Sequence, residues 1–187
     1  MNYTLMIFGL IAVALIIVAW IAMSYRRMRK SDDTVVQAWV SLKDVLADRF
    51  DVLSQIKEYA DSTSNEALQE SILRSMNAYS RAYKTNNPAR AGQAEKIFMK
   101  ETIPLLASTI KETSAVSETR ELREKIASTD KAIKSERRAY NEVALRHNNN
   151  ISQIPVNLLA AVFKVGERKT FLAPEDADRQ LLNLRFE

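Results

Sequence analysis

The stretch LREKIASTDKAIKSERRAYNEVALRHNNNISQIPVNLLAAVFKVGERKTF, residues 122–171, decides the fold. Its apolar or half-apolar residues recur at steps of three and four, which is the spacing of one packing face of a helix, as in a coiled coil. They are Leu122, Ile126, Thr129, Ile133, Arg137, Tyr140, Ala144, His147, Ile151 and Ile154. The pattern predicts one long helix over 117–154 that packs against other helices and is ended by Pro155. A short amphipathic helix follows, and we expect it to stop at Gly166.

Three further helices are predicted upstream, over 31–60, 66–83 and 88–112. The apolar face of the first is Val36, Trp39, Leu42, Leu46, Phe50, Leu53, Ile56 and Ala60, and that of the second is Leu68, Ile72, Met76, Tyr79 and Tyr83. Asp32 and Asp33 suit the start of the first helix, or that helix continues directly from the segment before it. The stretch 61–65 is rich in capping residues, and Asn87 before Pro88 is typical of a helix start.

Long helices with short connections predict an all-α fold, an antiparallel up-and-down bundle. Pro104 is expected to kink or divide the third helix. A bend is expected over 113–119, a turn over 173–178, and an extended tail over 181–186. Three Gly and four Pro in 187 residues agree with short loops. The expected domains are an anchor over 1–30 and a helical bundle over 31–187.

Residues 3–25 carry no charged side chain and are dominated by aliphatic residues. As a helix they would span roughly 34 Å, enough for the hydrocarbon core of a bilayer. Tyr3 at one end, with Trp20 and Tyr25 at the other, suits the two membrane interfaces. A cleaved signal peptide is the alternative, but it would have charges before its apolar core and a shorter core. We therefore predict an uncleaved signal-anchor.

The positive charge of the chain is concentrated directly after this segment, at Arg26, Arg27, Arg29 and Lys30. Residues 31–187 have 23 basic and 23 acidic side chains, so no basic surface for nucleic acid is predicted. A juxtamembrane basic cluster suits anionic lipid headgroups and orients an anchor with the cluster in the cytoplasm. We expect a single-pass protein of the bacterial inner membrane with its N-terminus outside and its C-terminal domain in the cytoplasm.

No catalytic, cofactor or metal site is predicted. The chain has no Cys, one His, and glycines too scattered for a phosphate-binding loop. A triad that uses His147 stays open, because triads are assembled in space. His147 falls on the apolar face of its helix, however, and a packed core histidine explains it more simply. The motif Glu-x-x-His of di-metal bundles does not occur.

Two stretches carry matches to the sequence pattern of a known family. The first is AWVSLKDVLADRFDVLSQI, 38–56, with matches at Ala38, Trp39, Ser41, Leu46, Arg49 and Asp51. The second is YNEVALRHNNNISQIPVNLLAAVFKVGERKTF, 140–171, with matches at Tyr140, Asn141, Val143, Asn148, Ile151, Pro155, Asn157, Leu158, Ala160, Phe163, Lys169 and Phe171. By these matches the chain resembles the LemA family of bacterial membrane proteins. It departs from the family pattern at Ser54, Gln55, His147, Ile154 and Lys164, so it is a divergent match.

The resemblance implies a single N-terminal anchor and a helical bundle, and it offers no catalytic residues. The matched polar residues exceed what a generic bundle helix requires. Asn148, Asn149 and Asn150 are explained by fraying before Pro155, or one of them or Asn141 makes a buried polar contact that fixes the register of the bundle. We also predict that Asn157 or Asn141 satisfies backbone groups left open where the helix ends.

The sequence favours a non-enzymatic, membrane-anchored scaffold or interaction protein whose partner is another protein or a second copy of itself. The alternative is a lipid-binding or membrane-shaping protein that uses the basic cluster and the amphipathic segment 158–165. In both, the anchor contacts membrane lipids. An enzyme is the third and least favoured class.

Overall fold

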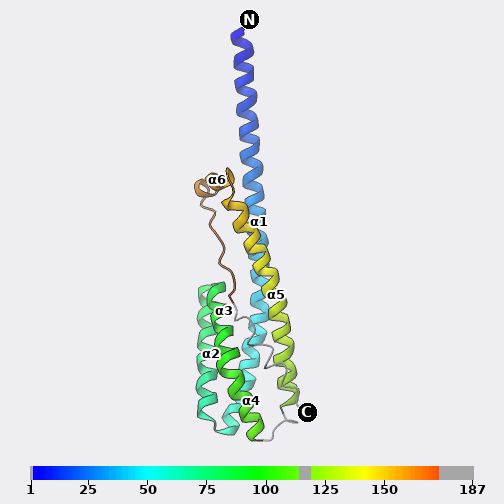
Figure 1. Ribbon diagram of the computed structural model, residues 1–187, viewed down its shortest axis with the longest axis vertical. Coiled ribbons are helices and arrows are strands. Elements are labelled where there is room, and N and C mark those ends of the chain that lie inside the picture. Colours follow the sequence, from blue (N-terminus) through cyan, green and yellow to red (C-terminus); the bar gives the residue numbers. More distant parts are fainter. Residues whose placement is uncertain (1, 114–118, 173–187) are drawn as a thin grey trace. The chain divides into compact units, whose positions relative to one another are not determined.

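The computed structural model describes residues 2–113 and 119–172, and all regular structure within them is helical. The all-α prediction is confirmed. The elements are α1 (Asn2–Thr63), α2 (Glu66–Thr85), α3 (Pro88–Ile97), the π-helical turn η1 (Phe98–Thr102), α4 (Ile103–Glu112), α5 (Arg120–Ser152) and α6 (Val156–Val162) (Figure 1). The predicted turn over 173–178, the tail over 181–186 and most of the bend over 113–119 lie outside the described residues.

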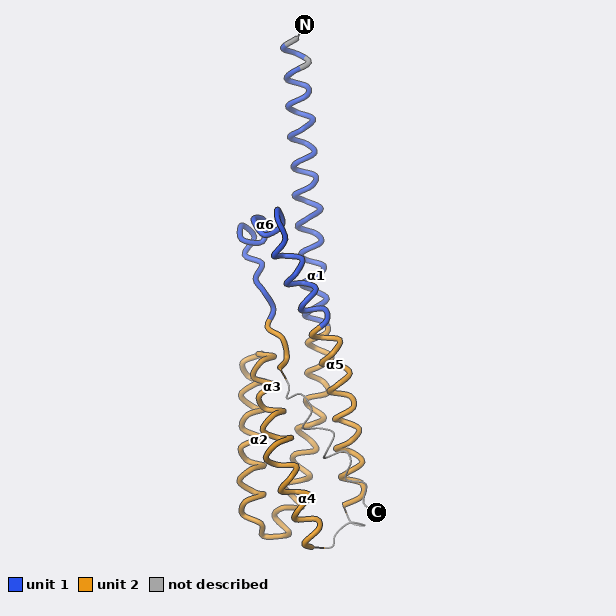
Figure 2. Tube along the Cα trace, viewed as in Figure 1, with its two compact units in different colours: residues 1–37, 142–168 blue, residues 38–141, 169–187 orange. Residues whose placement is uncertain are grey.

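The chain divides into two compact units, and α1 and α5 contribute to both. Unit 1 combines residues 1–37 with 142–168, and unit 2 combines residues 38–141 with 169–187 (Figure 2). Each unit therefore joins segments that are far apart in the sequence.

Unit 2 is an antiparallel bundle in which α1, α2, α3 to α4, and α5 alternate in direction (Figure 1). Each helix turns an apolar stripe inward, as the spacing of the sequence predicts. The fully buried apolar side chains include Leu42, Leu53, Ile56, Ala60, Leu68, Ile72, Ala94 and Phe98. The bundle of long helices is thus held mainly by aliphatic burial.

Two asparagines start the helices of this bundle as predicted. The Asn65 side chain accepts a hydrogen bond from the backbone N–H of Leu68 at the start of α2. The Asn87 side chain accepts a hydrogen bond from the backbone N–H of Ala89 at the start of α3, where Pro88 occupies the first turn. Such caps satisfy backbone donors that have no partner inside the helix.

Pro104 divides the predicted third helix, as expected. Proline has no N–H and its ring clashes with the carbonyl one turn earlier. The helix relieves this by widening into η1, and the N–H of Ile103 bonds the carbonyl oxygen of Phe98. The widened turn still buries Phe98, Met99 and Thr102.

Unit 1 is built from the N-terminal half of α1, the end of α5, and α6. Its core is Met28, Ile151 and Ala160, with Tyr25, Val156, Leu159 and Val165 packed around them. Before this core, the aliphatic side chains of α1 are exposed, as at Leu10, Leu15 and Ile16. By length and composition α1 is the one described helix able to cross a membrane.

Of the two expectations for the start of the first helix, direct continuation from the segment before it is confirmed, because α1 runs through Asp32 and Asp33 without a break. Two other sequence-based boundaries were wrong. The last long helix ends at Ser152, so Ile154 lies beyond it and is 83% exposed instead of on the packing face. Gly166 does not stop α6. The chain leaves α6 after Val162, through Lys164 in the left-handed region at φ 54°.

The predicted faces of the first two helices need four corrections. Val36 and Tyr83 are exposed, and Phe50 and Met76 are only half-buried. Val35 and Arg49 take the core positions in α1 instead. A periodicity of apolar side chains passes over a charged residue, so it selected Phe50 instead of the neighbouring Arg49, and it cannot distinguish Val35 from Val36.

Candidate functional site

A cluster of charged side chains lies in the middle of unit 2. The Arg49 guanidinium has no exposed side-chain surface. Its Nη2 lies 3.1 Å from Glu95 Oε1 and 3.5 Å from Asp130 Oδ1, and its Nη1 donates to the carbonyl oxygen of Ile126 at 3.3 Å. The cluster therefore joins α1, α3 and α5 in one network.

Two neighbours complete this network. The Tyr79 hydroxyl on α2 donates to Glu95 Oε2, and Lys134 Nζ lies 2.9 Å from Asp130 Oδ2. The guanidinium carbon of Arg49 is 4.6 Å from the centre of the Phe98 ring. Two cations face two carboxylates, so the cluster is close to neutral. Burial lowers the pKa of Arg49, but electrostatic interaction with Glu95, Tyr79 and Asp130 outweighs it, and the pKa is raised.

Arg49 was expected from the family pattern, but Glu95, Asp130 and the role of Tyr79 were not predicted. A signal was available. Arg49 stands between Leu46 and Leu53 at core spacing, and Glu95 stands between Ala91 and Phe98 in the same way. A charge of opposite sign at a core position on each of two helices predicts a buried ion pair.

Replacing Tyr79 by Phe is expected to lower the free energy of unfolding by about 1–3 kcal/mol at neutral pH, because Glu95 loses a buried donor. Burial, followed by the adjacent Glu95 charge, raises the pKa of Tyr79 well above its ordinary value of 10.0. The protonated hydroxyl therefore stabilises the fold below pH 10.0, and this contribution is lost as the pH rises above it.

The measurement is denaturant unfolding of the wild type and Tyr79→Phe at several pH values on both sides of 10.0. The difference between the two proteins should shrink at up to about 1.4 kcal/mol per pH unit. The exposed Tyr83 supplies the control, since Tyr83→Phe should leave the stability unchanged at neutral pH. A difference that stays constant with pH would contradict the assignment.

Two asparagines of α5 hold the extended segment that follows α6. In unit 2, Asn141 Nδ2 donates to the carbonyl oxygen of Phe171 at 3.0 Å, and Asn141 Oδ1 accepts from its N–H at 2.8 Å. In unit 1, Asn148 makes the same pair of bonds with the backbone of Arg168, at 2.9 and 2.8 Å. Of the two explanations for the asparagines, the polar contact is the one seen at Asn141 and Asn148.

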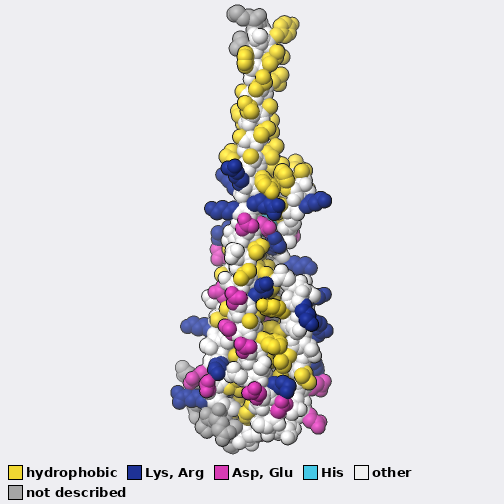
Figure 3. Space-filling model, turned by 180° about the vertical axis from the view of Figure 1, so that it is seen from behind, with side chains coloured by type: hydrophobic (Ala, Val, Ile, Leu, Met, Phe, Trp, Pro, Cys, Tyr) yellow, Lys and Arg dark blue, Asp and Glu magenta, His cyan; other side chains and the backbone are white. Residues whose placement is uncertain are grey.

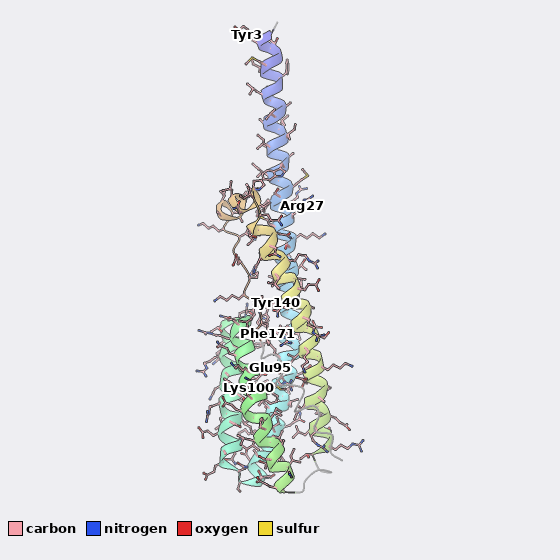
Figure 4. All side chains as sticks on the ribbon, viewed as in Figure 1. Tyr3, Arg27, Glu95, Lys100, Tyr140 and Phe171 are labelled. Atoms are coloured by element: carbon pink, nitrogen blue, oxygen red, sulfur yellow. The ribbon has the colours of Figure 1, made fainter. Side chains whose placement is uncertain are left out.

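Phe171 is the apolar end of this segment. Its side chain is 1% exposed in unit 2, and the nearby Tyr140 hydroxyl donates to the carbonyl oxygen of Lys169 at 2.6 Å (Figure 4). The ring of Trp39 lies 5.5 Å from that of Tyr140, and its Nε1 donates to Asn86 Oδ1 at 2.7 Å. These resemblance residues therefore form one connected group in the bundle.

The predicted role of Asn157 was wrong. Its Oδ1 is buried and has no hydrogen-bond partner among the described residues. Asn141 does not serve the helix end near Pro155 either, since both of its amide atoms bond Phe171. Pro155 itself is exposed.

Asn141→Ala is expected to lower the free energy of unfolding by about 2 kcal/mol, because two hydrogen bonds of about 1 kcal/mol each are lost. Asn157→Ala is the matched control and should not lower stability, since its oxygen accepts no bond. Thermal unfolding of the two full-length variants in detergent measures the difference. Equal destabilisation by both changes would count against this division of roles.

An open pocket of about 320 Å³ lies on the surface of unit 2 between α1 and α2. Its walls are largely apolar and aromatic, and they include Trp39, Leu46, Phe50, Tyr79 and Tyr83. Lys43, Lys84 and Asp51 also line it, which gives the family-motif residue Asp51 an exposed place at the site. Lys43 Nζ lies 5.7 Å from the centre of the Tyr83 ring.

The remaining predicted site residues belong to unit 1. Arg26, Arg27, Arg29 and Lys30 are exposed on α1, and Arg29 Nε donates to the Tyr25 hydroxyl at 3.0 Å. Leu158 is 65% exposed and Phe163 40% exposed. The ring of Phe163 nevertheless lies 4.6 Å from that of Tyr25.

His147 is a core histidine in unit 1. It is fully buried, with Nδ1 3.2 Å from Ser31 Oγ and Nε2 3.3 Å from the carbonyl oxygen of Gly166. Both ring nitrogens thus contact structural neighbours. His147 Nε2 also lies 3.8 Å from Asp32 Oδ1, so a serine, a histidine and an aspartate are adjacent here. The ring is fully buried and Nε2 faces the backbone carbonyl of Gly166, which is the environment of a packed histidine.

The described structure is that of a helical-bundle protein with one apolar helix that suggests a membrane anchor. Comparison with known families matches the LemA family over residues 38–186. The chain belongs to the LemA family. No curated protein and no solved structure matches the chain.

Proposed function

We propose that this LemA-family chain is a non-enzymatic, membrane-anchored protein of the bacterial envelope whose helical bundle binds another protein. The observation that supports this is the aromatic pocket between α1 and α2. Aromatic side chains around an open apolar hollow are typical of sites that receive a side chain of a partner. Two lysines against one aspartate at this pocket favour an acidic partner segment.

Site-specific crosslinking in native membranes tests this proposal. A photoreactive residue replaces Tyr83, which lines the pocket and is 58% exposed. A matched probe replaces Arg138, which is exposed on α5 and does not line the pocket. We expect a discrete crosslinked product from position 83 alone. A product of twice the mass identifies a second copy, and equal or no crosslinking at both positions contradicts the proposal.

The proposed orientation places the N-terminus outside the inner membrane and the C-terminal domain in the cytoplasm. It is supported by the basic cluster that follows the apolar part of α1. Protease digestion of intact spheroplasts should leave the C-terminal domain whole. Cleavage of that domain from outside would reverse the orientation.

A second candidate function is contact of α6 with lipid. Ile154, Leu158, Val162 and Phe163 expose 83%, 65%, 72% and 40% of their surface. Phe163 packs on Tyr25, where the apolar part of α1 ends, so these side chains lie beside that end within unit 1. An amphipathic segment in this place suits the bilayer interface.

Spin labels in reconstituted full-length protein test this second candidate. A label at Val162 should be reached by oxygen, which dissolves in lipid, and be protected from a water-soluble nickel reagent. A label at the exposed Leu145 on α5 is the comparison. Equal access of the nickel reagent to both positions would contradict the proposed contact of α6 with lipid.

A further inference from the structure

A pocket with a basic lining lies between α1 and α5 within unit 1. Its volume is about 280 Å³. The polar side chains around it are Arg27, Lys30, Ser31, Thr34, Arg146 and Asn150. Space-filling shows dark-blue basic side chains gathered just where the yellow apolar part of α1 ends (Figure 3).

Helix geometry brings these residues together. Arg27, Lys30 and Thr34 recur at steps of three and four, so they share one face of α1. Arg146 and Asn150 are four apart and share one face of α5. The pocket is therefore built by two facing helices and not by a loop.

The charge of this pocket is positive and largely uncompensated. Three cations line it, and no acidic side chain does. Within the described part of the chain no ion pair involves Arg27 or Lys30, while Arg146 is paired with Glu142 through Nη2. Asp32, the nearest acidic residue after Ser31, is engaged by Arg168 at 2.6 Å. Neither carboxylate neutralises the two cations on α1.

The hydrogen-bonding groups of the lining also suit an anion. Ser31 already contacts His147, and the Thr34 hydroxyl donates to the carbonyl oxygen of Lys30 at 2.8 Å. The donors left for a ligand are those of the Arg27 guanidinium, of the Lys30 ammonium group, of the Asn150 amide, and of Arg146 apart from the Nη2 bond to Glu142. Arg and Lys side chains in this arrangement are typical of phosphate recognition.

The position of Arg27 and Lys30 along α1 favours a lipid phosphate over a free phosphate ion. A helix rises 1.5 Å per residue, so Arg27 lies about 3 Å and Lys30 about 7.5 Å beyond Tyr25. The headgroup layer of a bilayer is roughly 5–8 Å thick on each side of the hydrocarbon core. If Tyr25 marks the edge of the core, the two cations of α1 lie at the depth of lipid phosphates.

We propose that this pocket binds the phosphate group of an anionic phospholipid. The inference rests on the proposed membrane anchor but not on the proposed protein partner. Arg27 and Arg146 contact the phosphate oxygens from the two helices, Lys30 adds a point charge, and Asn150 donates from its amide. The lipid would thereby tie the end of α5 to α1 at the membrane surface.

Lipid binding to the full-length protein, purified in a neutral detergent, tests the proposal by native mass spectrometry. Phosphatidylglycerol, phosphatidylcholine and inorganic phosphate are titrated separately. The wild type should bind phosphatidylglycerol at least 10-fold more tightly than phosphatidylcholine, because each cation near an anionic headgroup raises the affinity about fivefold. Inorganic phosphate should not displace the anionic lipid.

Two triple variants of equal charge separate the pocket from general attraction. Arg27→Gln, Lys30→Gln and Arg146→Gln together should abolish the preference for phosphatidylglycerol, a loss on the order of 100-fold. Arg26→Gln, Arg29→Gln and Arg138→Gln together remove three exposed cations that do not line the pocket, and should keep it. Circular dichroism checks that both remain helical.

Three results would overturn the proposal. Equal loss in both triple variants would show charge attraction without a site. Displacement by inorganic phosphate would assign the pocket to the free ion instead of a lipid. Absence of any preference for the anionic lipid in the wild type would contradict lipid binding at this pocket. Absence of crosslinking at position 83 would contradict only the proposed protein partner and would not bear on the lipid.

Discussion

Arg49→Met is expected to lower the free energy of unfolding by about 3–5 kcal/mol. The change removes a guanidinium with no exposed surface and leaves Glu95, 5% exposed, facing Asp130 without it. Breaking a buried pair from one side costs more than the pair contributes, because Glu95 and Asp130 would face each other away from water with only Tyr79 and Lys134 left as partners. Against a typical total of about 5–15 kcal/mol, this is a large share of the stability.

The measurement is thermal and denaturant unfolding of the full-length protein in detergent. Arg74→Met is the control, because Arg74 is 58% exposed and its ion pairs with Glu70 and Glu101 lie at the surface. It should cost less than about 1 kcal/mol. A double variant, Arg49→Met with Glu95→Gln, removes one stranded charge and should recover part of the loss. A single variant as stable as wild type would show that the cluster contributes little.

Gly92→Ala is the second change with a large expected effect, and its sign is unusual. Alanine in place of glycine inside a helix normally stabilises by about 1 kcal/mol. At Gly92 an added Cβ would lie 2.7 Å from the carbonyl carbon and 3.0 Å from the nitrogen of Leu172, both backbone atoms. The segment of residues 169–172 would have to move, and we expect a net loss of about 3 kcal/mol from Phe171 burial and the Asn141 bonds.

Proteolysis and hydrogen exchange of the full-length variant check this prediction, since both report the detachment of residues 169–172. Gly166→Ala is the matched control, because a Cβ there meets nothing within 4 Å. Increased exchange at Phe171 in Gly92→Ala alone is the expected result. A Gly92→Ala protein more stable than wild type would mean that helix propensity outweighs the contact.

The helices of this fold were predictable because each one carries an apolar stripe at helical spacing. The starts at Asn65 and Asn87 were predictable because a capping side chain and Pro88 act within a few residues. The end of α6 was not, because Lys164 adopts a left-handed conformation that glycine usually provides. The helix ends at that point because Ala160 and Val165 pack in the core of unit 1, and such tertiary packing cannot be read from neighbouring residues in the sequence.

The candidate sites were only partly predictable from the sequence. Arg49 was found by resemblance, but Glu95 and Asp130 lie 46 and 81 positions further along the chain, and only the bundle brings them together. The roles of Asn141 and Asn148 required the path of residues 168–171, which has no periodic pattern. The basic pocket combines a visible cluster, Arg27 and Lys30, with Arg146 on a distant helix.

The extended segment after α6 is held through hydrogen bonds to its backbone. Asn141 and Asn148 each bind the N–H and the carbonyl group of one residue, and Tyr140 binds a carbonyl oxygen. None of these bonds depends on which side chain the segment carries at Lys169 or Thr170. Those two positions should therefore tolerate almost any residue except proline in a saturation library. Tyr140, Asn141 and Asn148 on α5 should tolerate few substitutions, because their side chains make these bonds, whereas the segment contributes only backbone groups to them.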